Sequence, residues 1–407
     1  MDQQFDIVII GNSAAGMQAL RTLHRHSRNH SVAIVDRETH PAYSRVLTPY
    51  YVGGKTERSN LFIVDHAFYH RLGVATLFGQ PAVEIDADRH RLTLGNGKTI
   101  GFGALLIASG AEARSIEISA AGICTLRHLD DADRLAQLLP EARSVTAIGA
   151  GLVSIPFLSH AGPELERHLV VGSNRIFSRV VDAEASAILE ERFVADGLQL
   201  HKQDDVVDLA GGERLELALA SGKRLTTDML LVGKGVVPNT GLARQAGLAV
   251  RDGILIDDHC RTSHPDIYAA GDVAEGRDFV TGESTIQGNW LTAVEQAEVA
   301  ALNMLQLPAT YPGSMKNNTT EVFGVDIAAV GYCRDDAPRV ISAHDRFTGR
   351  FRKVFLDEQD RVLGATLIGE TNDAGGYYQL VTTRAVFPGE RLLRGVNSYA
   401  ARLLALA

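Results

Sequence analysis

The stretch that decides the fold is FDIVIIGNSAAG, residues 5 to 16. Its first six residues, apolar except for Asp6, form a run that ends at a glycine, as a strand buried in a parallel sheet does. Residues 14 to 26 follow with helical spacing, and a second apolar run, residues 31 to 35, ends at Asp36. This order of strand, glycine turn, helix, strand and acid predicts the first βαβ unit of a dinucleotide-binding fold.

The turn itself, GNSAAG, departs from the pattern G-x-G-x-x-G at its middle glycine, which is Ser13. Gly11 suits a tight turn, a small residue lets a pyrophosphate approach the helix, and Gly16 allows close packing of helix on strand. Asp36 stands where a carboxylate accepts hydrogen bonds from an adenosine ribose. A purely structural turn would also use glycine, but strand, helix and acid in register favour nucleotide binding.

The same pattern returns once along the chain. Residues 145 to 148 form an apolar run, GAG follows at 149 to 151, and residues 168 to 171 form the next strand. Pro163 falls where the intervening helix should continue, and interior proline disfavours a helix, so we expect that helix to be short or broken. Pro156 is expected to weaken the same helix. The strand is followed by GSNR, residues 172 to 175, with no acid to receive a ribose hydroxyl.

Other segments outline the remaining architecture. Asn96-Gly97 predicts a hairpin turn, residues 104 to 108 a buried strand ending at Ser109-Gly110, and residues 229 to 232 a matching strand before Gly233. From about Ser314 alternating strands follow, then a helix around residues 376 to 385. This tail predicts a small α+β domain.

Composition limits the function classes. The 407 residues are 45% hydrophobic and 22% charged with a formal net charge of -9, and no long run of like charge occurs. We therefore expect no nucleic-acid or polybasic membrane surface. The first residues enter a strand without a basic flank or cleavage site, and no apolar run approaches a membrane span, which predicts a soluble, cytoplasmic protein.

The three cysteines, Cys124, Cys260 and Cys333, lie far apart. They form neither a C-x-x-C redox pair nor a ligand set for zinc or an iron–sulfur cluster. We expect ordinary packing roles for all three, and no metal site.

A third motif, YAAGDVAEG at residues 268 to 276, ends a strand with glycine and aspartate. The aspartate could simply cap the next helix. Together with the first nucleotide turn and the ASG at 108 to 110, however, it resembles the flavoprotein pyridine-nucleotide reductases, a family that includes glutathione reductase and rubredoxin reductase. The resemblance covers residues 4 to about 380. It implies an α/β fold with two Rossmann-like domains, for FAD and NAD(P), and a C-terminal domain.

The resemblance also implies domain boundaries and cofactors. The FAD domain would comprise residues 1–112 and 243–313, the NAD(P) domain residues 113–242, and a C-terminal interface domain residues 314–407. FAD and either NAD(H) or NADP(H) would bind. The flavin residues implied are Gly11, Ser13, Ala14, Ala15, Gly16, Asp36, Arg37, Arg45, Thr48, Ala82, Ala108, Ser109, Gly110, Gly271, Asp272, Asn289 and Trp290. Trp290 could instead be a core residue.

For the nicotinamide nucleotide the resemblance implies Gly149, Gly151, Val153, Ser173, Arg175 and Gly233. Pro156 stands where many relatives carry a glutamate near the nicotinamide. Ser173 and Arg175 could accept a 2′-phosphate, which leaves NADH and NADPH equally open.

The loop YSRVLTPYY, residues 43 to 51, carries Val46 where disulfide-reducing relatives have a cysteine facing the flavin. Its sequence is similar to that of the corresponding loop in the FAD portion of nitrite reductase large subunits. By that resemblance Arg45 lies against the flavin or its phosphates, where a fixed cation would stabilise the reduced ring, so Arg45 is the candidate catalytic residue. The alternative is a surface arginine paired with a carboxylate.

The function implied is an FAD-dependent NAD(P)H oxidoreductase without an active-site disulfide. It would exchange electrons with a one-electron carrier such as a rubredoxin, a ferredoxin or an iron–sulfur subunit, either by itself or as the FAD subunit of a larger complex of the nitrite reductase or aldehyde oxidoreductase type. Two alternatives stay open: an NAD(P)H oxidase that uses oxygen, and a flavin-bearing scaffold or sensor subunit whose nicotinamide site has decayed. The partner, the direction of electron flow and the oligomeric state stay open as well.

Overall fold

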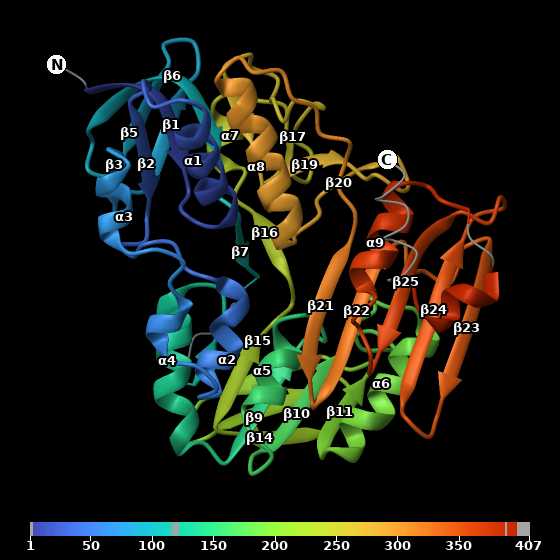
Figure 1. Cartoon of the computed structure of the whole chain (residues 1–407). Helices are drawn as coiled ribbons and strands as arrows, with labels where there is room; N and C mark the ends of the chain where they lie inside the picture. Colours follow the sequence, from blue (N-terminus) through green and yellow to red (C-terminus); the bar gives the residue numbers. More distant parts are fainter. Residues whose placement is uncertain (1–2, 115, 117–121, 387–388, 397–407) are drawn as a thin grey trace. The chain divides into compact units, whose positions relative to one another are not determined.

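The computed structural model describes residues 3–114, 116, 122–386 and 389–396. The chain folds into two compact units (Figure 1). The first comprises Met1–Ser44, Ser59–Glu112 and Val237–Met315, and the second comprises Arg45–Arg58, Ala113–Val236 and Lys316–Ala407. The short strands β7 (Ala111–Ala113) and β16 (Val236–Pro238) lie where the chain passes from one unit to the other.

The first unit contains a sheet in the order β3-β2-β1-β6-β5-β4, with β18 also paired to β6. Parallel pairing joins β1 (Gln3–Ile10), β2 (Val32–Asp36), β3 (Ala75–Phe78), β6 (Thr99–Ile107) and β18 (Ile267–Ala269). Strands β4 (Ala82–Asp86) and β5 (Arg91–Leu94) extend it in antiparallel fashion. The predicted hairpin is confirmed, because Gly97 makes the turn between β5 and β6 with φ +80°.

Two helices of the first unit, α1 (Ala14–His26) and α8 (Trp290–Met304), pack against each other. They share a buried cluster with the central strands, in which alanines permit a close approach. The remaining elements of this unit are α3 (His66–Arg71), α7 (Gly241–Gln245), β17 (Ile254–Leu255), β19 (Ala274–Arg277) and β20 (Ser284–Thr285). A short 3-10 turn, η2 (Arg58–Leu61), lies at the boundary between the two units.

The second unit contains a five-stranded parallel sheet in the order β11-β10-β9-β15-β8. Its strands are β8 (Ile123–Cys124), β9 (Ser144–Ile148), β10 (Glu166–Val171), β11 (Leu198–Lys202) and β15 (Met229–Val232), and its helices are α4 (Leu129–Leu138), α5 (Ser154–His160) and α6 (Ala183–Ala195). A 3-10 turn, η3 (Leu139–Glu141), follows α4. Strands β12 (Val206–Ala210), β13 (Leu215–Leu219) and β14 (Arg224–Thr227) form a separate antiparallel sheet.

The second unit also includes the C-terminal sheet and one short N-terminal segment. The sheet is antiparallel in the order β21-β22-β25-β24-β23 and is followed by α9 (Ala374–Thr382) and the 3-10 turn η4 (Gly389–Arg394). Its strands are β21 (Asn317–Val322), β22 (Val325–Gly331), β23 (Arg339–Asp345), β24 (Arg350–Leu356) and β25 (Val362–Ile368). The N-terminal segment holds η1 (Arg45–Leu47) and α2 (Thr48–Val52).

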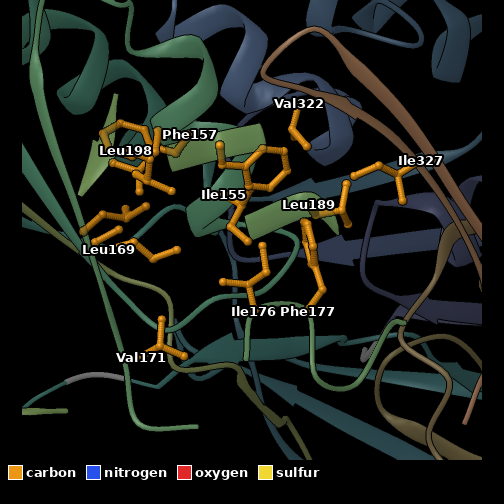
Figure 2. Packing of buried hydrophobic residues seen from close by; sticks show 14 of the residues in the cluster. Ile155, Phe157, Leu169, Val171, Ile176, Phe177, Leu189, Leu198, Val322 and Ile327 are labelled. Carbon is orange, nitrogen blue, oxygen red and sulfur yellow. The ribbon is translucent and has the colours of Figure 1, made fainter. Parts of the chain in front are cut away.

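One buried hydrophobic cluster joins the parallel sheet of this unit to the C-terminal sheet. Ile155 and Phe157 of α5 lie in the same cluster as Val322 of β21 and Ile327 of β22 (Figure 2). Polar contacts reinforce the junction, because Lys353 on β24 reaches Asp182 at 2.9 Å and Glu184 at 3.1 Å. Burial by itself would lower the pKa of Lys353, but the two carboxylates outweigh it and raise that pKa.

Two histidines on neighbouring strands of the parallel sheet contact each other. Nδ1 of His168 on β10 lies 3.2 Å from Nε2 of His201 on β11, and the rings stack with centroids 5.5 Å apart. Burial, with help from Lys223 and His168, lowers the pKa of His201 to about 4, whereas Asp204 opposes the shift. Burial also lowers the pKa of His168, against the opposite effect of Glu166. Both rings are therefore neutral at pH 7.

This pair predicts a dependence of stability on pH. Between pH 6.5 and about 4 His201 binds a proton in the unfolded chain but not in the folded chain. The free energy of unfolding therefore falls as the pH falls through this window. His201→Gln should flatten that fall by on the order of 1 to 2 kcal/mol, allowing for partial exposure. Urea unfolding at pH 7 and pH 4.5 measures the effect, with exposed His344→Gln as the control. Equal pH dependence in all three proteins would contradict it.

Candidate functional site

The first glycine turn is shaped by two very close backbone approaches. Gly11 has φ +105°, and a Cβ on it would lie 2.2 Å from the carbonyl oxygen of Ala108 at the end of β6. A Cβ on Gly16 would lie 1.9 Å from the carbonyl oxygen of Gly11. Both positions therefore require glycine, as the sequence pattern predicted. The turn and the start of α1 are held directly against the end of β6.

The start of α1 suits an anion. Its N-cap residue, Ser13, makes no capping hydrogen bond with its side chain, and the first turn contains no acid. By contrast, Asp182 caps α6 and Asn289 caps α8. Uncapped N–H groups and the helix dipole favour a pyrophosphate at this end, and the small residues Ala14 and Ala15 leave it accessible. The residues present thus fit the nucleotide that the motif predicts.

Asp36 is held in place at the end of β2. Its carboxylate accepts hydrogen bonds from the backbone N–H of Asn12 at 2.6 Å and of Glu38 at 2.8 Å. The buried side chain of Asn12 in turn accepts from the Tyr69 hydroxyl at 2.8 Å. Asn12 was missed in the sequence, where it occupies a position that the glycine pattern leaves free. It couples the turn to the acid that we expect to meet the ribose.

The third motif meets the first in space. Gly271 has φ +82°, and a Cβ on it would lie 3.5 Å from the side chains of both Ala15 and Ala293. Its N–H donates to Gln296 of α8 at 2.9 Å. The next residue, Asp272, follows this contact directly and is half-buried. Segments more than 250 residues apart therefore converge beside the start of α1.

The other predicted flavin residues of the first unit lie at several places in it. Asn289 caps α8 through Thr292, and Trp290 at the first position of that helix is 37% exposed, so the alternative of a core tryptophan is wrong. Ser109 and Gly110 bond to Asn239, whose amide donates to the Ser109 carbonyl at 2.8 Å. Arg37 forms an ion pair with Glu112. Ala82 begins β4.

Arg45 and Thr48 belong to the second unit. Arg45 donates to the carbonyl oxygen of Arg127 and lies 3.4 Å from Nδ1 of His128, while the Thr48 hydroxyl donates to the Arg45 carbonyl at 2.8 Å. Val46, in the place of a flavin-facing cysteine, is 58% exposed. Contact of Arg45 with a flavin stays a prediction.

Helix α2, which follows Arg45, packs against α5, the helix after the second glycine turn. Tyr50 of α2 packs against His160 of α5 with ring centroids 4.2 Å apart and the ring planes tilted by 37°. A Cβ on Gly53 would lie 2.3 Å from the His160 carbonyl oxygen. Tyr51 and Arg58 both bind Asp133 of α4 at 2.9 Å. The segment that carries Arg45 therefore forms part of the packing of the second unit.

The second glycine turn repeats the geometry of the first. Gly149 has φ +90°, and a Cβ on it would lie 2.5 Å from the carbonyl oxygen of Gly233 after β15. A Cβ on Gly233 would in turn meet the Ser154 hydroxyl at 2.0 Å. Gly151 differs, because a Cβ there would have no neighbour within 4 Å among the residues that the structure describes. Val153, the N-cap of α5, makes no capping bond with its side chain.

The expectation of a short helix after this turn is confirmed. Helix α5 ends at His160, two residues before Gly162, which has φ +103°, and three before Pro163. Pro156 is the third residue of α5, in the first turn, where its missing N–H is tolerated. Pro156 therefore does not weaken the helix as the sequence suggested, because only Pro163 stands where continuation would be needed.

The two residues that could accept a 2′-phosphate are engaged in other contacts. Arg175 forms an ion pair with Asp335 at 2.7 Å and also donates to the carbonyl oxygen of Ser178 at 3.3 Å. The Ser173 hydroxyl donates to the carbonyl oxygen of Arg175 at 2.7 Å. Asp335 lies in the loop after β22 and was missed in the sequence, because no local pattern connects it with the end of β10.

All three cysteines are free and buried. Burial raises the pKa of each thiol, to about 11 for Cys333, and raises those of Cys124 and Cys260 as well. Buried, protonated thiols are poor nucleophiles. The cysteines thus offer no redox pair for electrons leaving a flavin.

Comparison with known proteins decides the family. A model of the family described as pyridine nucleotide-disulphide oxidoreductase matches residues 5–300. The chain belongs to this family. This oxidoreductase therefore has FAD and a pyridine nucleotide as cofactors, as the sequence resemblance implied.

Relatives of this oxidoreductase serve in several electron-transfer systems. The NADH-dependent phenylglyoxylate dehydrogenase subunit epsilon of Aromatoleum evansii is 30% identical over 93% of this chain and 91% of that protein. The assimilatory nitrate reductase electron transfer subunit of Bacillus subtilis (strain 168) is 26% identical over 90% of this chain. The oxidoreductase spans about half of that second relative, 48% of its length.

A solved structure shares the whole fold. The ferredoxin reductase for the CYP199A2 system from Rhodopseudomonas palustris superposes with a TM-score of 0.90 at 25% identity, over 99% of this chain and 100% of that chain. The α/β fold with Rossmann-like sheets, predicted from the sequence, is confirmed.

Two further observations concern membrane spans and metal ions. Within the part of the oxidoreductase that the structure describes, none of the helices has the length and apolar character that crossing a membrane requires. His90, His264 and Asp266 lie close enough together to ligate a metal ion. Their contacts with one another, 3.5 Å from His90 to Asp266 and 3.3 Å from the Asp266 N–H to His264, explain this arrangement without one.

The contrast between Gly149 and Gly151 yields a prediction. Gly151→Ala should leave the oxidoreductase folded, because the new methyl group enters open space, yet weaken NAD⁺ binding about tenfold by obstructing the pyrophosphate. Gly149→Ala should instead lower the unfolding free energy by roughly 1 to 3 kcal/mol through strain and collision. Calorimetric titration and thermal melting separate the two effects. Unchanged NAD⁺ affinity in a folded Gly151→Ala protein would place the pyrophosphate elsewhere.

Proposed function

We propose that this chain is an NAD(P)H reductase whose flavin passes electrons to a one-electron carrier protein or an iron–sulfur subunit. The observation that carries the proposal is the combination of two glycine turns of the same geometry with three buried, unpaired cysteines. The turns provide for two nucleotides, and the cysteines provide no thiol acceptor. Electrons that leave the flavin must therefore go to a separate acceptor.

We assign the flavin to the first unit and the nicotinamide nucleotide to the second. Gly11, Gly16 and the uncapped start of α1 would hold the pyrophosphate of FAD, Asp36 its ribose, and Asp272 the ribityl side. When bound, FAD accepts a hydride equivalent and releases electrons one at a time, so that one NADH reduces two carrier molecules and releases one proton.

The named relatives support this type of partner. One is a ferredoxin reductase and another an electron transfer subunit, while a third is one subunit of an NADH-dependent dehydrogenase. We propose accordingly that this chain works either with a small ferredoxin or rubredoxin or as the FAD subunit of a larger complex. In such a complex the flow of electrons toward NAD⁺ is also allowed.

Reoxidation of the reduced flavin tests the proposal. After anaerobic reduction, mixing with a ferredoxin or rubredoxin should reoxidise the flavin at least about tenfold faster than air-saturated buffer does. Stopped-flow absorbance at the flavin band measures both rates, and two carriers should be reduced per NADH. Faster reoxidation by oxygen than by either carrier would favour the oxidase alternative instead.

A cysteine-free variant is the matched control. Changing Cys124, Cys260 and Cys333 to alanine removes only buried groups, and the folded variant should reduce the carrier within a few-fold of the wild-type rate. Loss of carrier reduction with flavin reduction intact would show that a thiol relays the electrons, and would overturn the assignment of Val46 to the cysteine position.

A further inference from the structure

The strand of the second unit that should present an acid to the nucleotide ribose lacks one. Strand β10 ends at Val171 and is followed by Gly172, Ser173, Asn174 and Arg175. In a dinucleotide-binding fold an acidic side chain at this point accepts the ribose 2′-hydroxyl and disfavours a 2′-phosphate. A carboxylate nevertheless stands beside this turn, and it comes from a distant part of the chain.

We infer that Asp335, in the loop after β22, replaces the missing acid and makes NADH the preferred nucleotide; this rests on the function proposed for the second turn. Asp335 Oδ2 lies 2.7 Å from Nη1 of Arg175, and its Oδ1 accepts a hydrogen bond from the N–H of Ala183 at 3.2 Å. The side chain is 48% exposed, so one side of the carboxylate remains open to a ligand.

The loop that carries Asp335 is firmly anchored. Cys333 is buried and points its thiol at the carbonyl oxygens of Val330 and Ala365, each 3.3 Å away. The Tyr332 hydroxyl donates to Asp336 at 2.7 Å. Because Val330 and Ala365 belong to the C-terminal sheet, that sheet fixes the carboxylate beside the nucleotide sheet of the same unit.

The turn leaves space for a sugar. In the described part of the chain, a Cβ on Gly172 would have one neighbour within 4.0 Å, the carbonyl oxygen of Asp204 at that distance. The usual position of the acid is therefore unoccupied by a side chain. In the inferred arrangement the carboxylate that meets the ribose comes from Asp335, which pairs with Arg175 three residues along the turn, rather than from the strand itself.

The ion pairs around the end of β10 disfavour binding of a 2′-phosphate. Lys202 pairs with Glu190 and Lys234 with Asp205, each at 2.6 Å, so both lysines have acidic partners, as does Arg175. Burial tends to raise the pKa of Asp335, but Arg175 and the Ala183 N–H outweigh it and lower that pKa, which keeps the carboxylate ionised at pH 7. A dianionic phosphate would have to displace a carboxylate from its cation.

Calorimetric titration of the flavin-loaded protein with ADP-ribose and 2′-phospho-ADP-ribose tests the inference without turnover. The wild type should bind ADP-ribose at least about tenfold more tightly. Asp335→Asn keeps an acceptor for the Ala183 N–H but removes the charge and frees Arg175. It should weaken ADP-ribose and strengthen the 2′-phosphate form, each about tenfold. Adding Arg175→Ala should abolish the gain for the phosphate form.

The matched control is Asp360→Asn, which breaks an ion pair with Arg339 elsewhere in the C-terminal region. Asp360 has φ +60°, a conformation that asparagine adopts readily, so the control should fold and bind both probes like the wild type. Should Asp335→Asn fail to fold, Arg175→Ala alone serves: it should leave ADP-ribose affinity within about twofold and keep the phosphate form weak.

The outcomes separate this inference from the function on which it rests. An unchanged ratio of the two affinities in Asp335→Asn, or a wild type that prefers the 2′-phosphate form, would overturn the role of Asp335 and leave the reductase in place. Binding of neither probe to the wild type would remove the nucleotide site of the second unit, and both proposals with it.

Discussion

The fold depends on one constraint that occurs twice, the contact between a glycine and the carbonyl oxygen at the end of a neighbouring strand. Gly11 meets Ala108 in the first unit and Gly149 meets Gly233 in the second, at separations that no Cβ tolerates. This contact brings each turn over the end of its parallel sheet and directs the next helix toward the strand ends. Ligands of open α/β sheets bind at such strand ends.

Around this shared frame the two units differ in how they present charge. In the first, Asp36 lies directly after its strand and is held by the N–H groups of Asn12 and Glu38. In the second, no acid follows the strand, and Asp335, from the loop after β22, pairs with Arg175 of the turn instead. The buried contacts of Lys353 with Asp182 and Glu184 tie that sheet to α6. On the inference drawn for Asp335, the C-terminal region would contribute to the nucleotide site as well as to the packing.

Short-range features were predictable from the sequence because they depend on local geometry. The parallel strands, the requirement for Gly11 and Gly149, the turn at Gly97 and the early end of α5 all follow from glycine and proline positions and apolar runs. Pro156 was misjudged because its effect depends on where the helix begins. The position of Arg45 in the second unit, the exposure of Trp290 and the Arg175–Asp335 pair depend on long-range packing, which no local pattern encodes.

The central claim, that a pyridine nucleotide bound to this chain reduces its flavin, has one direct test. The flavin-loaded protein would be titrated anaerobically with NADH while the flavin absorbance is followed, with dithionite defining full reduction. The account predicts complete bleaching by about one equivalent of NADH, since each donates two electrons. Bleaching by dithionite but not by millimolar NADH or NADPH would contradict it and would make the isolated chain a flavin-bearing scaffold.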